Sequence, residues 1–128
     1  MSKLNKSDVE RLKRYISECK TCQEENIEEH VNKLRNLIEK FPQNKIKKQF
    51  QIFKALGSLI RIKIMILLLQ LEEICPCELI VTFNVSQSNI SHHLTILERA
   101  GLITNYTQGK WKYYRVTDKG REISRLLE

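Results

Sequence analysis

The stretch VSQSNISHHLTILERAGLI, residues 85–103, decides the fold of this chain. Ser86 is a favourable N-cap residue and Gly101 is typical of a helix end, so the stretch predicts a helix over residues 87–100. One face of this helix is predicted to be buried because its apolar residues recur four and three positions apart. These residues are Ile90, Leu94 and Leu97. The other face carries hydroxyl groups and an imidazole, which indicates a surface for a polar partner.

The segments on either side of this helix predict its place in the fold. A short helix over residues 76–83 precedes it, and Asn84 in the tight turn between them tolerates the left-handed conformation. After the helix the period changes, and residues 103–107 and 111–116 are rich in β-branched and aromatic residues, which predicts a hairpin with its turn at 108–110. Helix, turn, helix and hairpin is the order of a winged helix-turn-helix, whose second helix enters the major groove of DNA.

The rest of the chain predicts helices, so the fold class is mainly α with a two-stranded β-hairpin wing and an N-terminal helical extension. The further helices are predicted over about 8–19, 27–41, 44–56, 59–71 and 117–128. A capping box at Ser7 to Glu10 opens the first of them. Gly57 is expected to end the third in the left-handed conformation. The helix over 59–71 is apolar on every side, which predicts a central, buried helix.

The candidate DNA contacts lie on the outer face of the second helix and on the wing. Small polar side chains let a helix approach base edges, a helix N-terminus favours phosphate, and basic wings hold the backbone. The candidates are Ser86, Gln87, Ser88, Asn89, Ser91, His92, Thr95, Lys110, Lys112 and Arg115. The alternative is a solvated helix face with ordinary surface charge. His93 is expected at the edge of the core, and Trp111, Tyr113 and Tyr114 in hairpin packing.

Charge supports a division into an extension over residues 1–43 and a DNA-binding domain over 44–128. The net charge is +7, of which the first segment carries +1 and the second +6. A basic domain favours a polyanionic partner, although charge alone also fits a basic protein without one. The start of the chain has no apolar signal region, and its most apolar stretch is shorter than the ~20 residues of a membrane span. We expect a cytoplasmic protein.

Four cysteines form two close pairs, Cys19 with Cys22 and Cys75 with Cys77. In a cytosolic protein such pairs indicate metal or redox chemistry more often than structural disulfides. Pro76 suits the first helical position, which makes Cys75 an N-cap residue. The helix N-terminus is expected to lower the pKa of both nearby thiols, and thiolate pairs select soft metals. As an alternative, Cys75 and Cys77 are small buried hydrophobic residues.

Several stretches together resemble the ArsR/SmtB family of metalloregulators. Residues 85–103 resemble its recognition helix, and ALGSLIRIKIMILLL, residues 55–69, resembles the helix before it, with Ser-Leu-Ile-Arg where Asp-Pro-Thr-Arg is usual. The run EICPCEL, residues 73–79, resembles the ELCVCDL box, which supplies two thiolates to arsenite, cadmium or lead. The run CQEENIEEHVNKL, residues 22–34, resembles the N-terminal extension of the cadmium/lead branch, whose cysteines reach the box of the opposite subunit.

The chain departs from the family pattern at three further places. Two residues instead of three separate the N-terminal cysteines. Ile80 stands where the arsenite branch often has a third sulfur, so a purely local three-sulfur site is absent. The last twelve residues contain no His, so the family's second metal site, on the final helix, is expected to be lost. His30 is a further candidate ligand, although a lone His among glutamates is more often simply exposed.

The resemblance implies a homodimeric repressor of double-stranded operator DNA, with recognition helices about one DNA turn, ~34 Å, apart. The N-terminal helices and the final helix are expected to form the interface. Arsenite, cadmium, lead or zinc would release the repressor by binding Cys75, Cys77, Cys19 and Cys22.

Two other hypotheses remain open: a thiol-redox (disulfide or persulfide) repressor of the same fold, and a metal-binding or scaffold protein that does not read sequence. No arrangement of residues predicts an enzyme, a small organic substrate or a membrane partner.

Overall fold

The structure is a computed structural model that describes residues 5–16 and 27–127. The chain divides into two units, Met1–Ile46 and Lys47–Glu128, and each is described by itself. Within the described ranges, no helix is both long enough and apolar enough to cross a membrane.

The first unit is a pair of packed helices, α1 (Lys6–Ile16) and α2 (Ile27–Lys40). No α2 side chain is buried, so this pair has no core of its own. The predicted capping box at Ser7 is wrong: α1 begins two residues earlier than predicted, and the Asp8 amide donates to Asn5 Oδ1 at 2.8 Å. Asn5 takes the cap because an Asn side chain accepts from a helix amide as well as Ser does.

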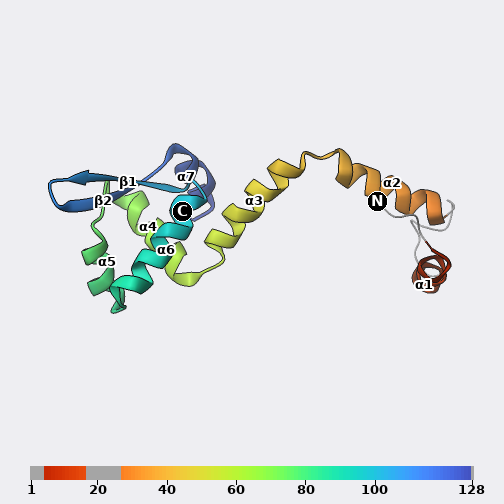
Figure 1. Ribbon diagram of the computed structural model, residues 1–128, viewed down its shortest axis with the longest axis horizontal. Helices are drawn as coiled ribbons and strands as arrows, with labels where there is room; N and C mark the ends of the chain where they lie inside the picture. Colours follow the sequence, from red (N-terminus) through yellow and green to blue (C-terminus); the bar gives the residue numbers. More distant parts are fainter. Residues whose placement is uncertain (1–4, 17–26, 128) are drawn as a thin grey trace. The chain divides into compact units, whose positions relative to one another are not determined.

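The second unit is the predicted winged helix-turn-helix (Figure 1). Its elements are the end of α3 (Gln43–Leu56), α4 (Leu59–Gln70), α5 (Pro76–Phe83), α6 (Gln87–Arg99), β1 (Ile103–Gln108), β2 (Trp111–Val116), α7 (Asp118–Ile123) and a 3-10 turn, η1 (Ser124–Leu127). The helix α4 packs against α6 and β2, and α5 packs against α6. The fold class predicted from the sequence is confirmed.

The core of this unit lies under α6. Its three inward residues, predicted from the apolar spacing, are almost fully buried: Ile90, Leu94 and Leu97. They pack with buried residues of α4, α5 and β1, among them Met65, Leu79 and Ile103. The helix α4 is not buried all round as predicted, because only one of its faces meets α6 and β2, and Leu59 is 78% exposed.

The turn before α6 and the end of α6 use left-handed residues, as the sequence predicts. Asn84 has φ 52° and ψ 52°, and Gly101 has φ 77°. After Gly101 the Leu102 amide donates to the Leu97 carbonyl at 3.1 Å, which closes the last turn of the helix. Ser86 Oγ accepts from the Asn89 amide at 3.1 Å and caps the N-terminus. These local signals fix where α6 begins and ends.

The end of α3 is built differently from the prediction, since Gly57 does not adopt a left-handed conformation. The guanidinium of Arg61 instead binds the last carbonyl groups of the helix. Its Nε donates to the Ala55 carbonyl at 2.6 Å, and its Nη2 to the Lys54 carbonyl at 3.4 Å. A cation at a helix C-terminus also interacts favourably with the helix dipole, so a side chain from the first turn of the next helix replaces the glycine signal.

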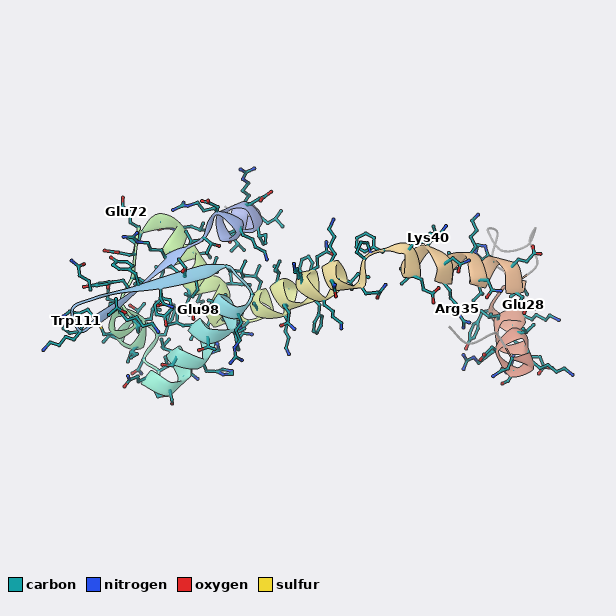
Figure 2. The ribbon with its side chains drawn as sticks, turned by 45° about the horizontal axis from the view of Figure 1, so that its top comes forward. Glu28, Arg35, Lys40, Glu72, Glu98 and Trp111 are labelled. Atoms are coloured by element: carbon teal, nitrogen blue, oxygen red, sulfur yellow. The ribbon has the colours of Figure 1, made fainter. Side chains whose placement is uncertain are left out.

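The wing is an antiparallel pair in which Ile103 faces Val116 and Gln108 faces Trp111. Gly109, with φ 64°, forms the tight turn with Lys110. Tyr114 is buried, and Tyr113 stacks on Tyr106, which agrees with their predicted packing role. Trp111 does not pack: it stands at the tip of the wing, 54% exposed (Figure 2).

Candidate DNA interface and thiol site

The outer face of α6 is fully available to a partner. All seven candidate residues at its start and along its outer face are exposed: Ser86, Gln87, Ser88, Asn89, Ser91, His92 and Thr95. Two hydroxyl groups are engaged with the helix itself, because Ser86 caps it and Thr95 Oγ1 donates to the Ser91 carbonyl at 2.8 Å. The remaining polar groups form a row of small side chains, the kind of surface that fits a major groove.

The two lysines of the wing are exposed, and they extend this surface. Lys112 Nζ lies 5.4 Å from the centre of the Tyr114 ring, a cation–π distance that holds the lysine over the strand. Lys110 lies in the turn itself. Both positive charges are exposed on the wing and remain candidates for contact with phosphate groups.

Arg115, the third basic residue of the wing, is bound to a partner within the chain. Its Nη2 lies 3.2 Å from Glu73 Oε2, and its guanidinium lies 4.4 Å from the centre of the Tyr106 ring. The Tyr106 hydroxyl donates to the same Glu73 oxygen. The pKa of Glu73 is held below its usual value mainly by the hydrogen bond from Tyr106. The hydrogen bond and the positive charge of Arg115 lower it further. Glu73, Tyr106 and Arg115 form a cluster, here called the wing clamp.

The wing clamp ties the wing to the segment that carries the second cysteine pair. Ile74, next to Glu73, pairs with Tyr114 as a short extra strand, with reciprocal amide-to-carbonyl bonds of 3.0 and 2.9 Å. Cys75 follows directly as the N-cap of α5, with Pro76 at the first helical position, as predicted. The cysteine pair is therefore joined to β2 by both backbone and side-chain bonds.

The sulfurs of Cys75 and Cys77 converge at the N-terminus of α5, 2.8 Å apart. A disulfide would bring them to about 2.05 Å. Two thiolates on one tetrahedral zinc, each ~2.3 Å from the metal, would lie about 3.8 Å apart. The observed separation lies between these two values. Cys75 is buried and Cys77 is exposed, which leaves one sulfur accessible to an incoming ion or oxidant.

The expected lowering of the thiol pKa is wrong for Cys77. Its pKa is raised, first by the hydrogen bond to Cys75, then by partial loss of water, and also by repulsion from the Glu78 carboxylate. The Glu78 side chain accepts from the Cys75 amide at 3.1 Å and completes the helix cap. The helix N-terminus alone would lower the pKa, but the neighbouring thiol and carboxylate outweigh it.

The cysteine pair opens onto a cavity of about 410 Å³ that it shares with α6 and β2. One wall is α5 with both cysteines and Ile80, a second is α6 with Gln87 and Ser91, and a third is β2 with Lys112. Three candidate DNA contacts thus line the same cavity as the two sulfurs.

A complete metal site is not present in residues 5–16 and 27–127, where no three potential metal ligands lie together. Two convergent sulfurs fit a soft ion but fill only part of its coordination. Cys19 and Cys22, the predicted partners, lie outside the described residues.

His93 has the structural role predicted for it. Arg61 Nη1 lies 2.9 Å from His93 Nδ1, and because a guanidinium only donates, the imidazole nitrogen accepts. Partial burial lowers the pKa of His93, and the positive charges of Arg61 and His92 lower it further. Sequence reasoning missed the roles of Arg61, Glu73 and Tyr106. His93 lies 32 residues from Arg61, and Glu73 lies 33 residues from Tyr106 and 42 from Arg115, so no local spacing connects these groups.

Comparison with known proteins places these features in one family. The model of the family described as "Bacterial regulatory protein, arsR family" matches residues 59–105. The arsenical resistance operon repressor of Bacillus subtilis is 44% identical over 82 residues, which are 64% of this chain and 76% of that protein. The putative arsenical resistance operon repressor ArsR of Halobacterium salinarum is 34% identical over 116 residues, 89% of this chain and 90% of that protein.

Among solved structures, HlyU from Vibrio cholerae matches with a TM-score of 0.60 at 26% identity, covering 67% of this chain and 94% of that chain. These relatives confirm the prediction of a regulator rather than an enzyme.

Proposed function

The chain belongs to the ArsR family of bacterial regulatory proteins, and from this premise we propose that it is a homodimeric repressor of operator DNA, released when a thiophilic ion binds its cysteine thiolates. Two relatives are named arsenical resistance repressors, which supports arsenite as the first ion to test, ahead of cadmium, lead and zinc.

The shared cavity is the observation that carries the proposal. Cys75 and Cys77, whose sulfurs lie 2.8 Å apart, line the same cavity as Gln87, Ser91 and Lys112. An ion bound in this cavity would lie beside the side chains that are proposed to contact DNA. Ion binding and DNA binding would therefore influence each other. Ligands that favour different arrangements of one element are coupled, typically by ~1–3 kcal/mol.

The wing clamp is a second structural connection between ion binding at the cysteines and DNA binding. Widening the sulfur pair from 2.8 Å toward the spacing of a metal complex moves Cys75, the residue that follows the Ile74–Tyr114 bridge. The bridge and the Glu73 side chain are bonded to β2 and β1, so the wing would shift relative to α6. We infer that ion binding holds the wing in a position that fits DNA poorly.

The dimer interface is proposed on the apolar surface of α3 and the C-terminal segment. Phe53 is 70% exposed and Leu126 is 90% exposed, and both line a cavity of about 710 Å³ with Ile52 and Ile123. Large apolar side chains gathered at one surface mark an interaction site. A second copy is the natural partner, because a two-fold repressor needs two recognition helices.

Cys19 and Cys22 are proposed to complete the coordination of the ion from the N-terminal extension. The two sulfurs at the start of α5 fill only part of the coordination of a soft ion, which leaves positions for further thiolates. The four thiols would therefore act as one site, whether within a subunit or between two.

The test needs no knowledge of the operator. The reduced protein is titrated with arsenite, and separately with cadmium, while the ultraviolet sulfur-to-metal absorption is followed. A saturable band in the wild type, lost in Cys75→Ser/Cys77→Ser and weakened or lost in Cys19→Ser/Cys22→Ser, supports a shared thiolate site. The absence of a band with both ions would refute ion sensing.

A redox repressor is the second candidate, favoured by the same sulfur separation of 2.8 Å. In that case an oxidant removes two electrons and two protons from the thiols and forms the Cys75–Cys77 disulfide. Oxidant would release DNA, reductant would restore binding, and arsenite would have no effect at concentrations that leave the thiols reduced.

A further inference from the structure

A second cavity, of about 430 Å³, lies on the other flank of α6 and is lined by basic side chains. They come from three separate segments: Lys54 from the last turn of α3, Arg61 from the first turn of α4, and His92 with Arg99 from α6. Gln51 adds an amide, and among the described residues no carboxylate lines the cavity. Four basic groups without an acid around one space form a site for an anion.

The charge of Arg61 is fixed in place but not neutralised. Its guanidinium binds two backbone carbonyls and the His93 ring, all of them uncharged acceptors. These bonds use three of the five donors of a guanidinium and orient the group firmly. Lys54 and Arg99 are exposed, and within the described residues neither has a carboxylate at ion-pair distance.

The helical geometry of α6 shows where the basic cavity lies relative to the outer face of this helix. Residues three and four apart share a helix face, so the outer row of Ser88, Ser91, His92 and Thr95 forms one strip. The thiol cavity touches α6 at Gln87, Ser91 and Leu94, and the basic cavity touches it at His92, Ile96 and Arg99. The strip that faces DNA therefore runs between the two cavities, and His92 belongs to both the strip and the basic cavity.

We propose that this cavity binds a phosphodiester of the DNA backbone, on the flank of α6 away from the wing. Lys54 and Arg99 contact the phosphate and Arg61 supplies a fixed positive charge behind them. A helix in the major groove has a phosphate strand on each side. The wing lysines would hold one strand and the basic cavity the other. This inference rests on the proposed DNA-binding function and adds Lys54, Arg61 and Arg99 to its interface.

The test measures affinity for a labelled DNA duplex of random sequence at several salt concentrations. Each neutralised phosphate contributes about 0.9 to the slope of log K against log salt. We expect Lys54→Gln/Arg99→Gln to lower affinity and to reduce the slope by about 0.9 for each phosphate that the variant no longer neutralises. Lys54→Arg/Arg99→Lys keeps both charges and should retain most of the slope.

Lys48→Gln/Lys63→Gln is the matched control, since it removes two exposed charges of the same unit that line neither cavity. An equal reduction of the slope in this control would overturn the assignment, because general charge would then explain the effect. An unchanged slope in Lys54→Gln/Arg99→Gln, with wild-type DNA binding intact, refutes this inference alone. A wild type that binds no DNA refutes the proposed function and this inference together.

Discussion

The two flanks of α6 present opposite chemistry to the same helix. On one flank two thiols, an isoleucine and a leucine surround a cavity with a single lysine. On the other, four basic side chains surround a cavity of similar volume. The first suits a soft ion that seeks sulfur, and the second suits a hard anion such as phosphate. An effector and the DNA backbone would therefore bind on opposite flanks of the recognition helix α6 and would not compete for the same side chains.

This difference gives each flank its own expected readout. Changes of Cys75 and Cys77 on the thiol flank should alter the response to effector and leave the basal affinity for DNA close to normal. Changes on the basic flank should alter affinity and its salt dependence, and leave the response to effector intact. Changes in the core beneath α6 should affect both.

The largest effect is expected from Leu97→Ala. Leu97 is fully buried under α6 and lines neither cavity. Its truncation leaves a void in the core, which typically lowers the free energy of unfolding by about 2–5 kcal/mol. Urea unfolding measures the loss, and DNA binding and ion binding should weaken together. Val81→Ala is the control, because Val81 is 80% exposed and its truncation should change stability by less than about 0.5 kcal/mol.

A smaller effect is expected from Tyr106→Phe, which removes the hydroxyl that binds Glu73. The wing then loses part of its link to the cysteine segment. Mutations along such a network change coupling by a factor of roughly two to thirty. The ratio of DNA affinities without and with arsenite should shrink, while the sulfur-to-arsenic absorption stays. Tyr113→Phe keeps the Glu73 bond, and an equal reduction in that variant would remove the wing clamp from the mechanism.

The smallest effect concerns pH. His93 is neutral in the folded protein because its pKa is lowered, whereas in the unfolded chain it titrates near 6.5. Below pH 6.5 the unfolded chain binds the extra proton first, so stability falls as pH drops from 6.5 toward the lowered pKa. The urea concentration at the midpoint of unfolding should fall as the pH is lowered from about 7.5 to about 5.5. It should fall less in His93→Gln than in wild type. His92→Gln should reduce the slope only slightly, because the charge of His92 is the smallest of the three causes that lower the pKa of His93. A flat slope in wild type would contradict the role of His93.

The sequence predicts the thiol flank better than the basic flank, for a physical reason. Cys75, Pro76 and Cys77 are neighbours, and their local helix geometry brings the sulfurs together whatever the rest of the fold does. Lys54, Arg61 and Arg99 meet only when three helices pack, so no spacing rule in the sequence connects them.

The helix ends show the same contrast. Asn84 and Gly101 adopt left-handed conformations as predicted, because their signals are local. The signal at Gly57 is overridden by Arg61, whose side chain reaches back to the end of α3. The pKa of Cys77 also departs from the prediction, since it depends on two neighbouring side chains as well as on the helix N-terminus. Backbone signals thus predict the structure more reliably than they predict the electrostatics of individual groups.

In the proposed mechanism, arsenite acts through the cysteines on one flank of α6, and the basic cavity on the other flank binds the DNA backbone. The most direct test compares DNA affinity, with and without arsenite, for three forms of the protein. Arsenite should weaken DNA binding of the wild type. Cys75→Ser/Cys77→Ser should bind DNA with near wild-type affinity and ignore arsenite. Lys54→Gln/Arg99→Gln should bind DNA more weakly yet lose affinity in arsenite by the same factor as wild type. Release of the cysteine variant at the same arsenite concentration as wild type would contradict the mechanism.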